Sequence, residues 1–246
     1  QRFPKIARMA DKNYGASVLM CNTYSKQFGI SLTPLYKGCN ISNSKTTLNT
    51  PVRIVYAGNL YYGREKTLAA IARALQGINS EKQLATLEIY TNTIITDEID
   101  AMLNIDRSSK IMGGRPFSEI QKILREADVV LHVESFDPQN IKIVRLSYST
   151  KISDCLQSGS MMLVVGPDGI ASVEEAKLID GVMVINDEQN IENSLRYLLC
   201  NSDSIIDAAS RTNVLAKNKF PIENVRKRLH DDGKRRDLYP CGGNLL

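Results

Sequence analysis

The sequence lacks the signals of a metal-binding, membrane-spanning or disulfide-stabilised protein. Its five cysteines are odd in number, widely spaced and form no CxxC pair, which argues for reduced thiols and against a disulfide framework or a structural zinc site. With only two histidines, His132 and His230, a histidine-based metal site is not expected. No apolar run approaches the roughly 20 residues of a membrane-spanning helix, and the first residues do not resemble a signal peptide. We therefore expect a cytoplasmic protein that holds neither a metal ion nor a cofactor.

Two common nucleotide-binding fingerprints are also missing. GxxxxGK[ST] does not occur, which disfavours an NTPase. GxGxxG is absent too, and the second predicted strand ends in Tyr90-Thr91-Asn92 without an acidic residue for a ribose, so a nicotinamide or flavin site is a weak hypothesis. The segment GNLYYGR, residues 58–64, nevertheless stands where a doubly wound fold keeps its first phosphate loop. Alternatively, the two glycines of this segment are only turn residues and bind no phosphate.

A strong excess of one charge is absent as well. The formal net charge is +4, and the basic residues are scattered until Arg226-Lys227-Arg228 and Lys234-Arg235-Arg236. Neither zinc spacing nor interleaved aromatic and basic residues accompany this cluster, so nucleic acid is not an expected partner. The cluster predicts peripheral contact with an anionic membrane surface, or else it is the solvated face of a terminal helix.

Strands and helices are predicted to alternate through most of the chain. Apolar strands are expected at residues 52–57, 86–90, 110–112, 129–133, 161–165 and 182–185. Helical periodicity is found between them, and helices are expected near residues 64–75, 97–103, 117–127, 149–156, 171–178 and 191–199. Such alternation predicts the α/β class, with a Rossmann-like doubly wound parallel sheet and helices on both faces. We expect Phe117 to be buried by its helix, and residues 134–148 to form a loop.

The remainder of the chain divides into two flanking parts. Residues 1–50 are predicted to be a connecting segment, with a helix over residues 16–29 and an extended piece at 32–36. The main domain is expected over residues 51–229, ending in one or two helices broken at Pro221, and residues 230–246 are expected to form a flexible tail. Because the chain starts at Gln1 and not at Met, we expect it to be a piece of a longer protein.

Polar residues cluster in the stretch from Asp128 to Gly169. Glu134 follows one predicted central strand, and Ser149-Thr150-Lys151 open the helix that leads to the next. Ligands of parallel sheets bind beyond the carboxyl ends of the strands, and a helix N-terminus with unpaired N–H groups attracts an anion. We favour a diphosphate as this anion. Alternatively, Ser149 is only an N-cap and Lys151 a solvated residue of the first turn.

Three segments together resemble a known family. The order AGN…GR ending at Arg64, then IMGGRPFSEIQKILREADVVLHVESFD, then STKISDCLQSGSMMLVVGPDG looks like the C-terminal, donor-binding half of family 4 glycosyltransferases of the GT-B fold. The resemblance extends over roughly residues 15–225 and is strongest at TKISDCLQSG. It implies that the predicted Rossmann-like sheet is one half of a GT-B fold and binds a nucleotide-sugar donor.

The resemblance also implies roles for particular residues. It places Gly58 and Asn59 in the loop that meets the diphosphate, Arg64 at the family's phosphate-binding lysine, Arg115 beside the nucleobase and Asp154 at the ribose. The anion site formed by Ser149, Thr150 and Lys151 would share the diphosphate. Two departures are apparent, since Asn59 replaces the arginine usual in the family and Asp154 replaces a glutamate.

Glu134 has the least secure of these assignments. It stands near the first glutamate of the family's paired acidic residues, which implies a catalytic role, but its spacing from Asp154 is far longer than in the family. Alternatively, Glu134 is a structural carboxylate that pairs with Arg145 or Lys142.

The implied function is a hexosyltransferase-type reaction. The chain would hold a nucleotide-diphosphate sugar, with UDP as the expected carrier, for transfer to a glycan or lipid-linked acceptor in polysaccharide biosynthesis. Catalysis in such enzymes needs an N-terminal acceptor domain that this chain lacks, so we expect the chain alone to be inactive. Two other hypotheses are a non-catalytic nucleotide-binding module and a GT-B-like sugar-nucleotide epimerase. The latter needs acid/base groups in the cleft, for which His132 is a candidate unless it is only a packed residue.

Overall fold

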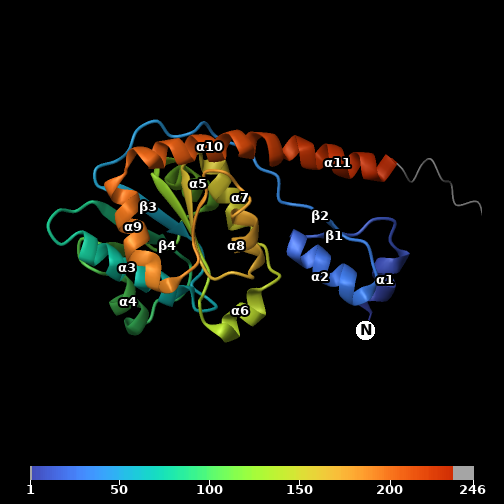
Figure 1. Ribbon diagram of the computed structural model, residues 1–246, viewed down its shortest axis with the longest axis horizontal. Helices are drawn as coiled ribbons and strands as arrows, with labels where there is room; N and C mark the ends of the chain where they lie inside the picture. The colour runs from blue at the N-terminus through green and yellow to red at the C-terminus, as the bar shows by residue number, and fades with distance from the viewer. Residues whose placement is uncertain (1, 235–246) are drawn as a thin grey trace, which may run out of the picture.

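A six-stranded, all-parallel sheet with helices on both faces forms the main body of the protein, beside a small N-terminal unit (Figure 1). The computed structural model describes residues 2–234. The sheet has the strand order β5-β4-β3-β6-β7-β8, with β3 at Val52–Ala57, β4 at Ala85–Tyr90, β5 at Ser109–Ile111, β6 at Val129–Val133, β7 at Met161–Val165 and β8 at Met183–Ile185. The chain progresses outward from β3 to β5 and then returns to the centre at β6. The point between β3 and β6 is therefore the topological switch point, where ligands of such sheets bind.

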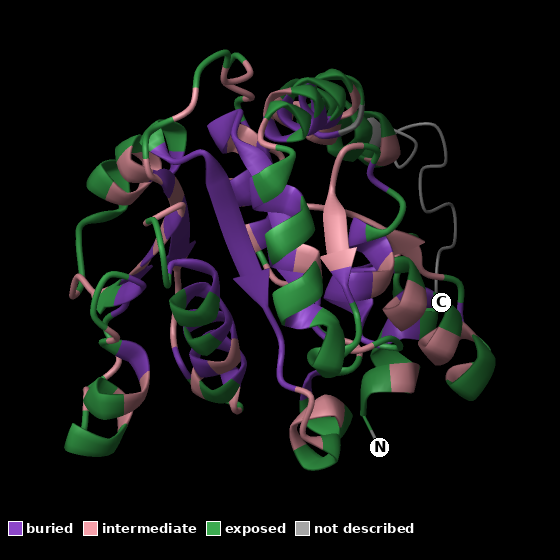
Figure 2. Cartoon of the chain, turned by 60° about the vertical axis from the view of Figure 1, so that its left-hand side comes forward, coloured by how far each residue is buried: buried purple, intermediate pink, exposed green. Residues whose placement is uncertain are grey.

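The helices cover the two faces of the sheet in separate layers. The helices after β2 are α3 (Arg64–Ile78), α4 (Asp97–Leu103), α5 (Phe117–Glu126), α6 (Pro138–Val144), α7 (Lys151–Ser158), α8 (Ala171–Ala176), a short 3-10 turn at Glu188–Asn190, α9 (Ile191–Cys200), α10 (Asp203–Lys219) and α11 (Ile222–Lys234). The last of them, α11, extends away from the sheet toward the N-terminal unit (Figure 1). Successive strand residues point to opposite faces, so Ile54 packs in the core under α3 and α9 while Val55 packs in the core under α5, α7 and α8. The strands between these layers are largely buried, as Figure 2 shows.

The N-terminal unit consists of α1 (Phe3–Met9), β1 (Tyr14–Gly15), α2 (Val18–Phe28) and β2 (Thr33–Pro34), with β1 and β2 paired in parallel. Residues of α8 and α11 hold it to the rest of the protein. Glu175 of α8 accepts hydrogen bonds from the Val18 N–H at 2.8 Å and the Tyr36 hydroxyl at 2.7 Å. At the other side, α11 reaches the unit (Figure 1), where Asp232 accepts from the Tyr14 hydroxyl.

The linker between β2 and β3 follows α7 along its length. The Ser153 hydroxyl donates to the Lys37 carbonyl at 3.1 Å, the Ser42 N–H donates to the Gln157 carbonyl at 3.0 Å, and the Lys45 N–H donates to the Gly159 carbonyl at 2.9 Å. Gly159 ends α7 with φ +79°, and a Cβ there would lie 2.0 Å from the Asn43 backbone oxygen. Only glycine fits this crossing, because the backbone that it touches cannot move aside as a side chain could.

Most of the predicted elements are confirmed, including all six strands and the break at Pro221. Three expectations were wrong. Phe117 is 59% exposed, since it is the first residue of α5. The predicted loop after β6 contains α6, which begins at the N-cap Asp137. The helix α11 continues through residues 230–234, the first part of the predicted flexible tail, while the rest of that tail lies outside the described residues.

The buried carboxylate of Asp128 fixes the start of β6 against the linker. It is fully buried, pairs with the Lys45 ammonium at 2.8 Å, and accepts from the Arg53 N–H at 2.7 Å and from the Asn49 backbone and side chain. A buried charge is tolerated only when it is paired and hydrogen-bonded in this way. Asp128 therefore joins three segments at the amino end of the central strands.

Replacing Asp128 with alanine is expected to lower the free energy of unfolding by about 3–5 kcal/mol, because the Lys45 ammonium and several N–H groups would lose their acceptor. Urea denaturation of the variant and the unaltered chain measures the difference. Glu126→Ala, two residues earlier and half exposed, is the control and should change stability by less than about 0.5–1 kcal/mol. Equal effects of the two substitutions would contradict the role assigned to Asp128.

Candidate functional site

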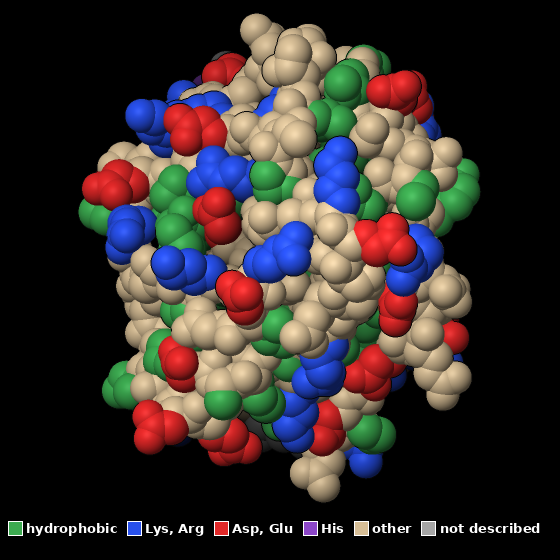
Figure 3. All heavy atoms as spheres, turned by 90° about the vertical axis from the view of Figure 1, so that its left-hand side faces the viewer, with side chains coloured by type: hydrophobic (Ala, Val, Ile, Leu, Met, Phe, Trp, Pro, Cys, Tyr) green, Lys and Arg blue, Asp and Glu red, His purple; other side chains and the backbone are tan. Residues whose placement is uncertain are grey.

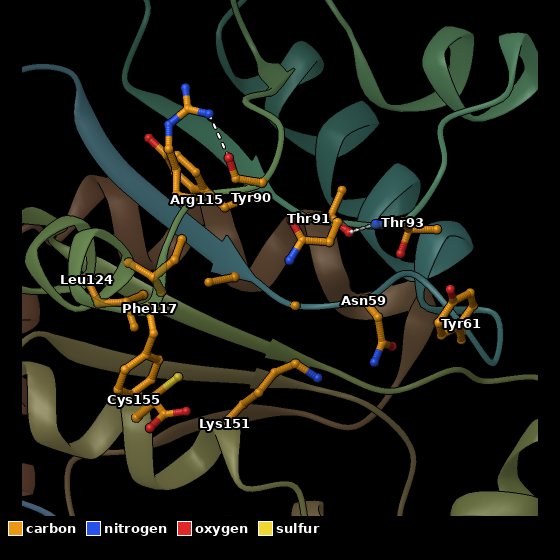
Figure 4. A pocket seen from close by; sticks show the side chains of 16 residues that line it. Asn59, Tyr61, Tyr90, Thr91, Thr93, Arg115, Phe117, Leu124, Lys151 and Cys155 are labelled. Carbon is orange, nitrogen blue, oxygen red and sulfur yellow. Dashed lines mark hydrogen bonds between the residues drawn. The ribbon is translucent and has the colours of Figure 1, made fainter.

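A cavity of about 480 Å³ opens at the carboxyl ends of β3 and β4 and is bordered by α7 (Figure 4). Four segments line it: the loop after β3, the end of β4, the turn before α5 with that helix, and α7. Its residues are Ala57, Gly58, Asn59, Tyr61, Tyr90, Thr91, Asn92, Thr93, Gly114, Arg115, Phe117, Ile120, Leu124, Lys151, Asp154 and Cys155. The position beside the switch point and the volume are those of a small-molecule site.

Lys151 supplies a cation to this cavity. Its side chain extends toward the part of the pocket where Asn59 lies (Figure 4), and it runs so close to the loop that a Cβ on Gly58 would be 2.2 Å from its Cε. Burial, with a smaller contribution from the positive charge of Arg64, lowers the pKa of Lys151 below its ordinary value. Within residues 2–234, no hydrogen bond or ion pair of this ammonium group is found. A partly desolvated cation of this kind is suited to bind an anion.

Asn59 presents amide donors to the same end of the cavity. Its Oδ1 accepts a hydrogen bond from the Arg64 Nη1 at 3.0 Å. A guanidinium group only donates, so the amide oxygen of Asn59 must face Arg64 and its NH₂ group must face away. Because Asn59 lines the cavity, these two N–H donors are available there.

Arg64 itself is withdrawn from the cavity into a buried network. It is 7% exposed and pairs through Nη2 with Glu134 Oε2 at 2.9 Å, while its Nε donates to the Val133 carbonyl at 3.2 Å. His132, fully buried, lies with its Nε2 3.1 Å from the other carboxylate oxygen of Glu134. Burial alone would raise the pKa of Glu134, but the hydrogen bond with His132 and the charge of Arg64 outweigh it and hold this pKa below 4.5. Glu134 is thus an ionised structural partner of Arg64.

Asp154 lies one helical turn after Lys151 on the same face of α7, and its carboxylate borders the cavity. One oxygen, Oδ1, is 2.6 Å from the ammonium of Lys37, a residue of the linker. The far end of the cavity is formed by Phe117 and by the turn at Gly114 and Arg115. Gly114 packs against Asn92, since a Cβ there would lie 1.7 Å from the Asn92 Oδ1, and the Arg115 guanidinium donates back to the Gly114 carbonyl at 2.8 Å.

The structure brings five of the predicted site residues together around the cavity, and these are Gly58, Asn59, Arg115, Lys151 and Asp154. The other predicted residues lie elsewhere. Arg64, which the resemblance places at the diphosphate, is instead buried against Glu134 and does not line the cavity.

Glu134, Ser149 and Thr150 also lie in surroundings that differ from those predicted for them. Glu134 is 2% exposed, does not line the cavity, and pairs with Arg64 and not with Arg145 or Lys142. Ser149 and Thr150 stand outside the cavity lining. The N-cap position belongs to Thr150 and not to Ser149, and its side chain makes no capping bond.

Sequence reasoning missed several residues that line or border the cavity. Thr91, Asn92 and Thr93 follow β4 directly, so the rule that ligands bind beyond the carboxyl ends of strands would have indicated them. Lys37 had no such signal, since it is 117 positions away from Asp154 and lies in a segment predicted only as a connection.

Further observations concern the surroundings of the cavity and the rest of the described residues. Within residues 2–234, no group of three or more His, Cys, Asp or Glu side chains is arranged to hold a metal ion, and no helix there has the length and apolar character needed to cross a bilayer. Acidic and basic side chains are interspersed on the face that carries α3, α4 and α9 (Figure 3). His132 is buried and absent from the cavity lining, so it offers no acid or base to a ligand there.

Comparison with known proteins finds similarity only at the level of structure. No protein-family model matches the sequence, and no curated protein matches it. Among solved structures, a mutant of Staphylococcus aureus TarM, in complex with fondaparinux, alpha-GlcNAc-glycerol and UDP, has a TM-score of 0.72 at 13% identity, covering 93% of this chain and 45% of that one. Anabaena HepE in complex with UDP-glucose has a TM-score of 0.68 at 14% identity, covering 93% and 65%.

A third similar structure is WaaG, a glycosyltransferase involved in lipopolysaccharide biosynthesis, with a TM-score of 0.64 at 12% identity, covering 94% of this chain and 62% of that one. These neighbours are glycosyltransferases of the GT-B fold. The chain therefore has the fold of a Rossmann-like half of GT-B glycosyltransferases, as its resemblance to family 4 predicted. It spans between 45% and 65% of the length of these three structures.

Replacing Glu134 with glutamine is expected to destabilise the protein by about 3–5 kcal/mol at neutral pH, because Arg64 would remain buried without a counter-ion. The folded-state pKa of Glu134 is lowered, so its stabilising contribution is complete above the unfolded value of about 4.5 and is lost as the pH falls through the folded value. The stability difference between variant and unaltered chain should therefore narrow as the pH falls below about 4.5.

Urea denaturation followed by circular dichroism at several pH values measures this narrowing. Glu119→Gln, on the exposed face of α5, is the control and should have a small effect at every pH. A difference for Glu134→Gln that stays constant down to about pH 3 would rule out an ionised, paired Glu134.

Proposed function

We propose that this chain is the donor-binding half of a GT-B glycosyltransferase and holds a nucleotide-diphosphate sugar, with UDP as the carrier. One observation carries the proposal: Lys151 and Asp154, on the same face of α7, both line the cavity at the switch point. Three residues along a helix advance by about 4.5 Å, a separation comparable to that between the diphosphate and the ribose hydroxyls of a nucleotide. A cation and a carboxylate at this spacing match those two parts of the ligand.

The diphosphate is assigned to the end of the cavity where Lys151 and Asn59 lie. The Lys151 ammonium, the amide donors of Asn59 and the positive end of the α7 dipole all favour an anion there. In transfer of the sugar, negative charge develops on the leaving diphosphate. Fixed donors and a desolvated cation stabilise that charge more than water does, because they need not reorganise. Arg64 contributes indirectly, by orienting the Asn59 amide.

The nucleoside is assigned to the rest of the cavity. Asp154 accepts hydrogen bonds from the ribose hydroxyls, and the turn at Gly114 and Arg115 meets the base, in the arrangement that the family resemblance implies. Phe117, exposed beside this turn, offers an aromatic face for the base. The similar structures of TarM and HepE contain UDP or UDP-glucose, which supports uridine as the preferred base.

The proposal also covers the donor sugar, the acceptor, the cellular location and the partners of this chain. We assign it a hexosyl donor, a glycan or lipid-linked acceptor, a role in polysaccharide biosynthesis and a cytoplasmic location. The exposed side chains of Arg226 and Lys227 on α11 fit peripheral contact with an anionic membrane. Catalysis requires donor and acceptor to be held together in a reactive geometry. The acceptor-binding half is a proposed partner, and this chain without it should bind the donor and transfer nothing.

Calorimetric titration of the purified chain with UDP and ADP tests the donor site, and incubation with labelled UDP-sugars and acceptor extracts tests transfer. We expect UDP to bind more tightly than ADP, with an affinity that falls as salt concentration rises, because charges hold the diphosphate. No sugar transfer is expected. Absence of binding by every nucleotide would overturn the proposal, and robust transfer would place the acceptor site within this chain.

Replacing Lys151 with methionine, which removes the charge and keeps most of the side-chain length, is expected to weaken UDP binding about 10- to 100-fold, since one charge-assisted interaction is lost. Uridine, which lacks phosphate, should bind the variant and the unaltered chain equally. Lys142→Met, on the exposed surface of α6, is the matched control. Equal losses for UDP and uridine would show that Lys151 has a structural role and not an anion-binding one.

A further inference from the structure

Lys37 contacts the cavity wall from outside the Rossmann-like sheet. It belongs to the linker that follows β2, and its carbonyl accepts from the Ser153 hydroxyl at 3.1 Å. Its ammonium lies 2.6 Å from Asp154 Oδ1 and 5.7 Å from the centre of the Phe117 ring. The backbone and the side chain of Lys37 are thus both tied to the elements that border the cavity.

The ion pair restrains one carboxylate oxygen and leaves the other available. The Asp154 side chain is only 19% exposed, and Oδ1 is occupied by Lys37, so Oδ2 is the oxygen left to accept a hydrogen bond from a ligand. An exposed lysine that pairs with a carboxylate usually adds little to stability. Lys37 is 41% exposed, so its ion pair with Asp154 should contribute little to the stability of the protein. The pair does, however, fix the orientation of the carboxylate, which a site that recognises hydroxyl groups requires.

We propose that Lys37 is a positioning residue that orients Asp154 toward the ribose hydroxyls and so determines the preference for ribonucleotides over deoxyribonucleotides. The proposal rests on the donor site proposed above. A site built to hydrogen-bond a hydroxyl rejects an analogue that lacks it, because its own polar group is then left unpaired. Lys37 strengthens this discrimination by holding the Asp154 carboxylate in one orientation.

The position of Lys37 also allows the opposite relation, in which its ammonium competes with the ligand for Asp154. The two relations predict opposite effects of removing Lys37 on the affinity for ligands with ribose hydroxyls. A positioning lysine increases the affinity for ligands with ribose hydroxyls, and its removal weakens their binding. A competing lysine must be displaced, and its removal strengthens their binding. We favour positioning because Lys37 engages a single oxygen of the carboxylate and its backbone is held by Ser153.

The test compares UDP with 2′,3′-dideoxy-UDP, by calorimetry, for the unaltered chain and for Lys37→Met. We expect the substitution to weaken UDP binding about 3- to 10-fold and to leave the dideoxy ligand unchanged. Lys37→Arg keeps the charge and should restore most of the preference. In a double-mutant cycle with Asp154→Asn, the Lys37 substitution should have no further effect. Lys122→Met, on the exposed side of α5, is the matched control, and thermal unfolding checks that each variant is folded.

Each outcome decides between the proposals. Failure of the unaltered chain to bind any nucleotide overturns the donor site and this inference together. If UDP binds but Lys37→Met keeps the full preference over the dideoxy ligand, the inference alone is wrong. Equal losses for both ligands would identify a structural or general electrostatic role, and tighter UDP binding would identify Lys37 as a competitor. If Lys37→Met does not fold, Lys37→Gln replaces it: a lost preference with unchanged dideoxy binding supports positioning, and an unchanged preference overturns it.

Discussion

The buried ion pair between Arg64 and Glu134 is the interaction on which the site depends. Arg64 begins α3 and Glu134 directly follows β6, so the pair joins the two elements that border the switch point. The pair also affects the chemistry of the cavity. The Arg64 guanidinium fixes the orientation of the Asn59 amide, and its positive charge helps to lower the pKa of Lys151. Removing charges from water is costly, and here that cost is offset by three hydrogen-bond acceptors around Arg64 and by the contacts of Glu134 with Arg64 and His132.

The fold could be predicted largely from the sequence because the patterns that specify its strands and helices lie within short segments of the chain. Strands such as Val52–Ala57 and Met161–Val165 are largely apolar runs, and the helices between them carry regular apolar stripes. Lys151 and Asp154 could be found for the same reason, since residues three positions apart on one helix share a face wherever the helix is placed. The turn at Arg115 and the glycine at position 58 followed from their positions directly after strands.

The other parts of the site depend on contacts that no local pattern encodes. An arginine after a glycine loop is compatible both with an exposed phosphate ligand and with a buried ion pair, and only the position of Glu134, seventy residues later, decides between them. The helix α6 was missed because its seven residues have no clear apolar stripe. Phe117 was misplaced for a related reason, since an aromatic residue at the first turn of a helix can cover a cavity as well as a core.

The path of the linker along α7 has a mechanical consequence. Its three backbone attachments, at Ser153, Gln157 and Gly159, are spaced along the helix axis and lie between the N-terminal unit and the sheet. A pull on the N-terminal unit along this path loads them in shear, so that they share the force and do not open one after another. The helix that carries Lys151 and Asp154 therefore receives part of such a force through the linker, beside α8 and α11, which hold the N-terminal unit directly.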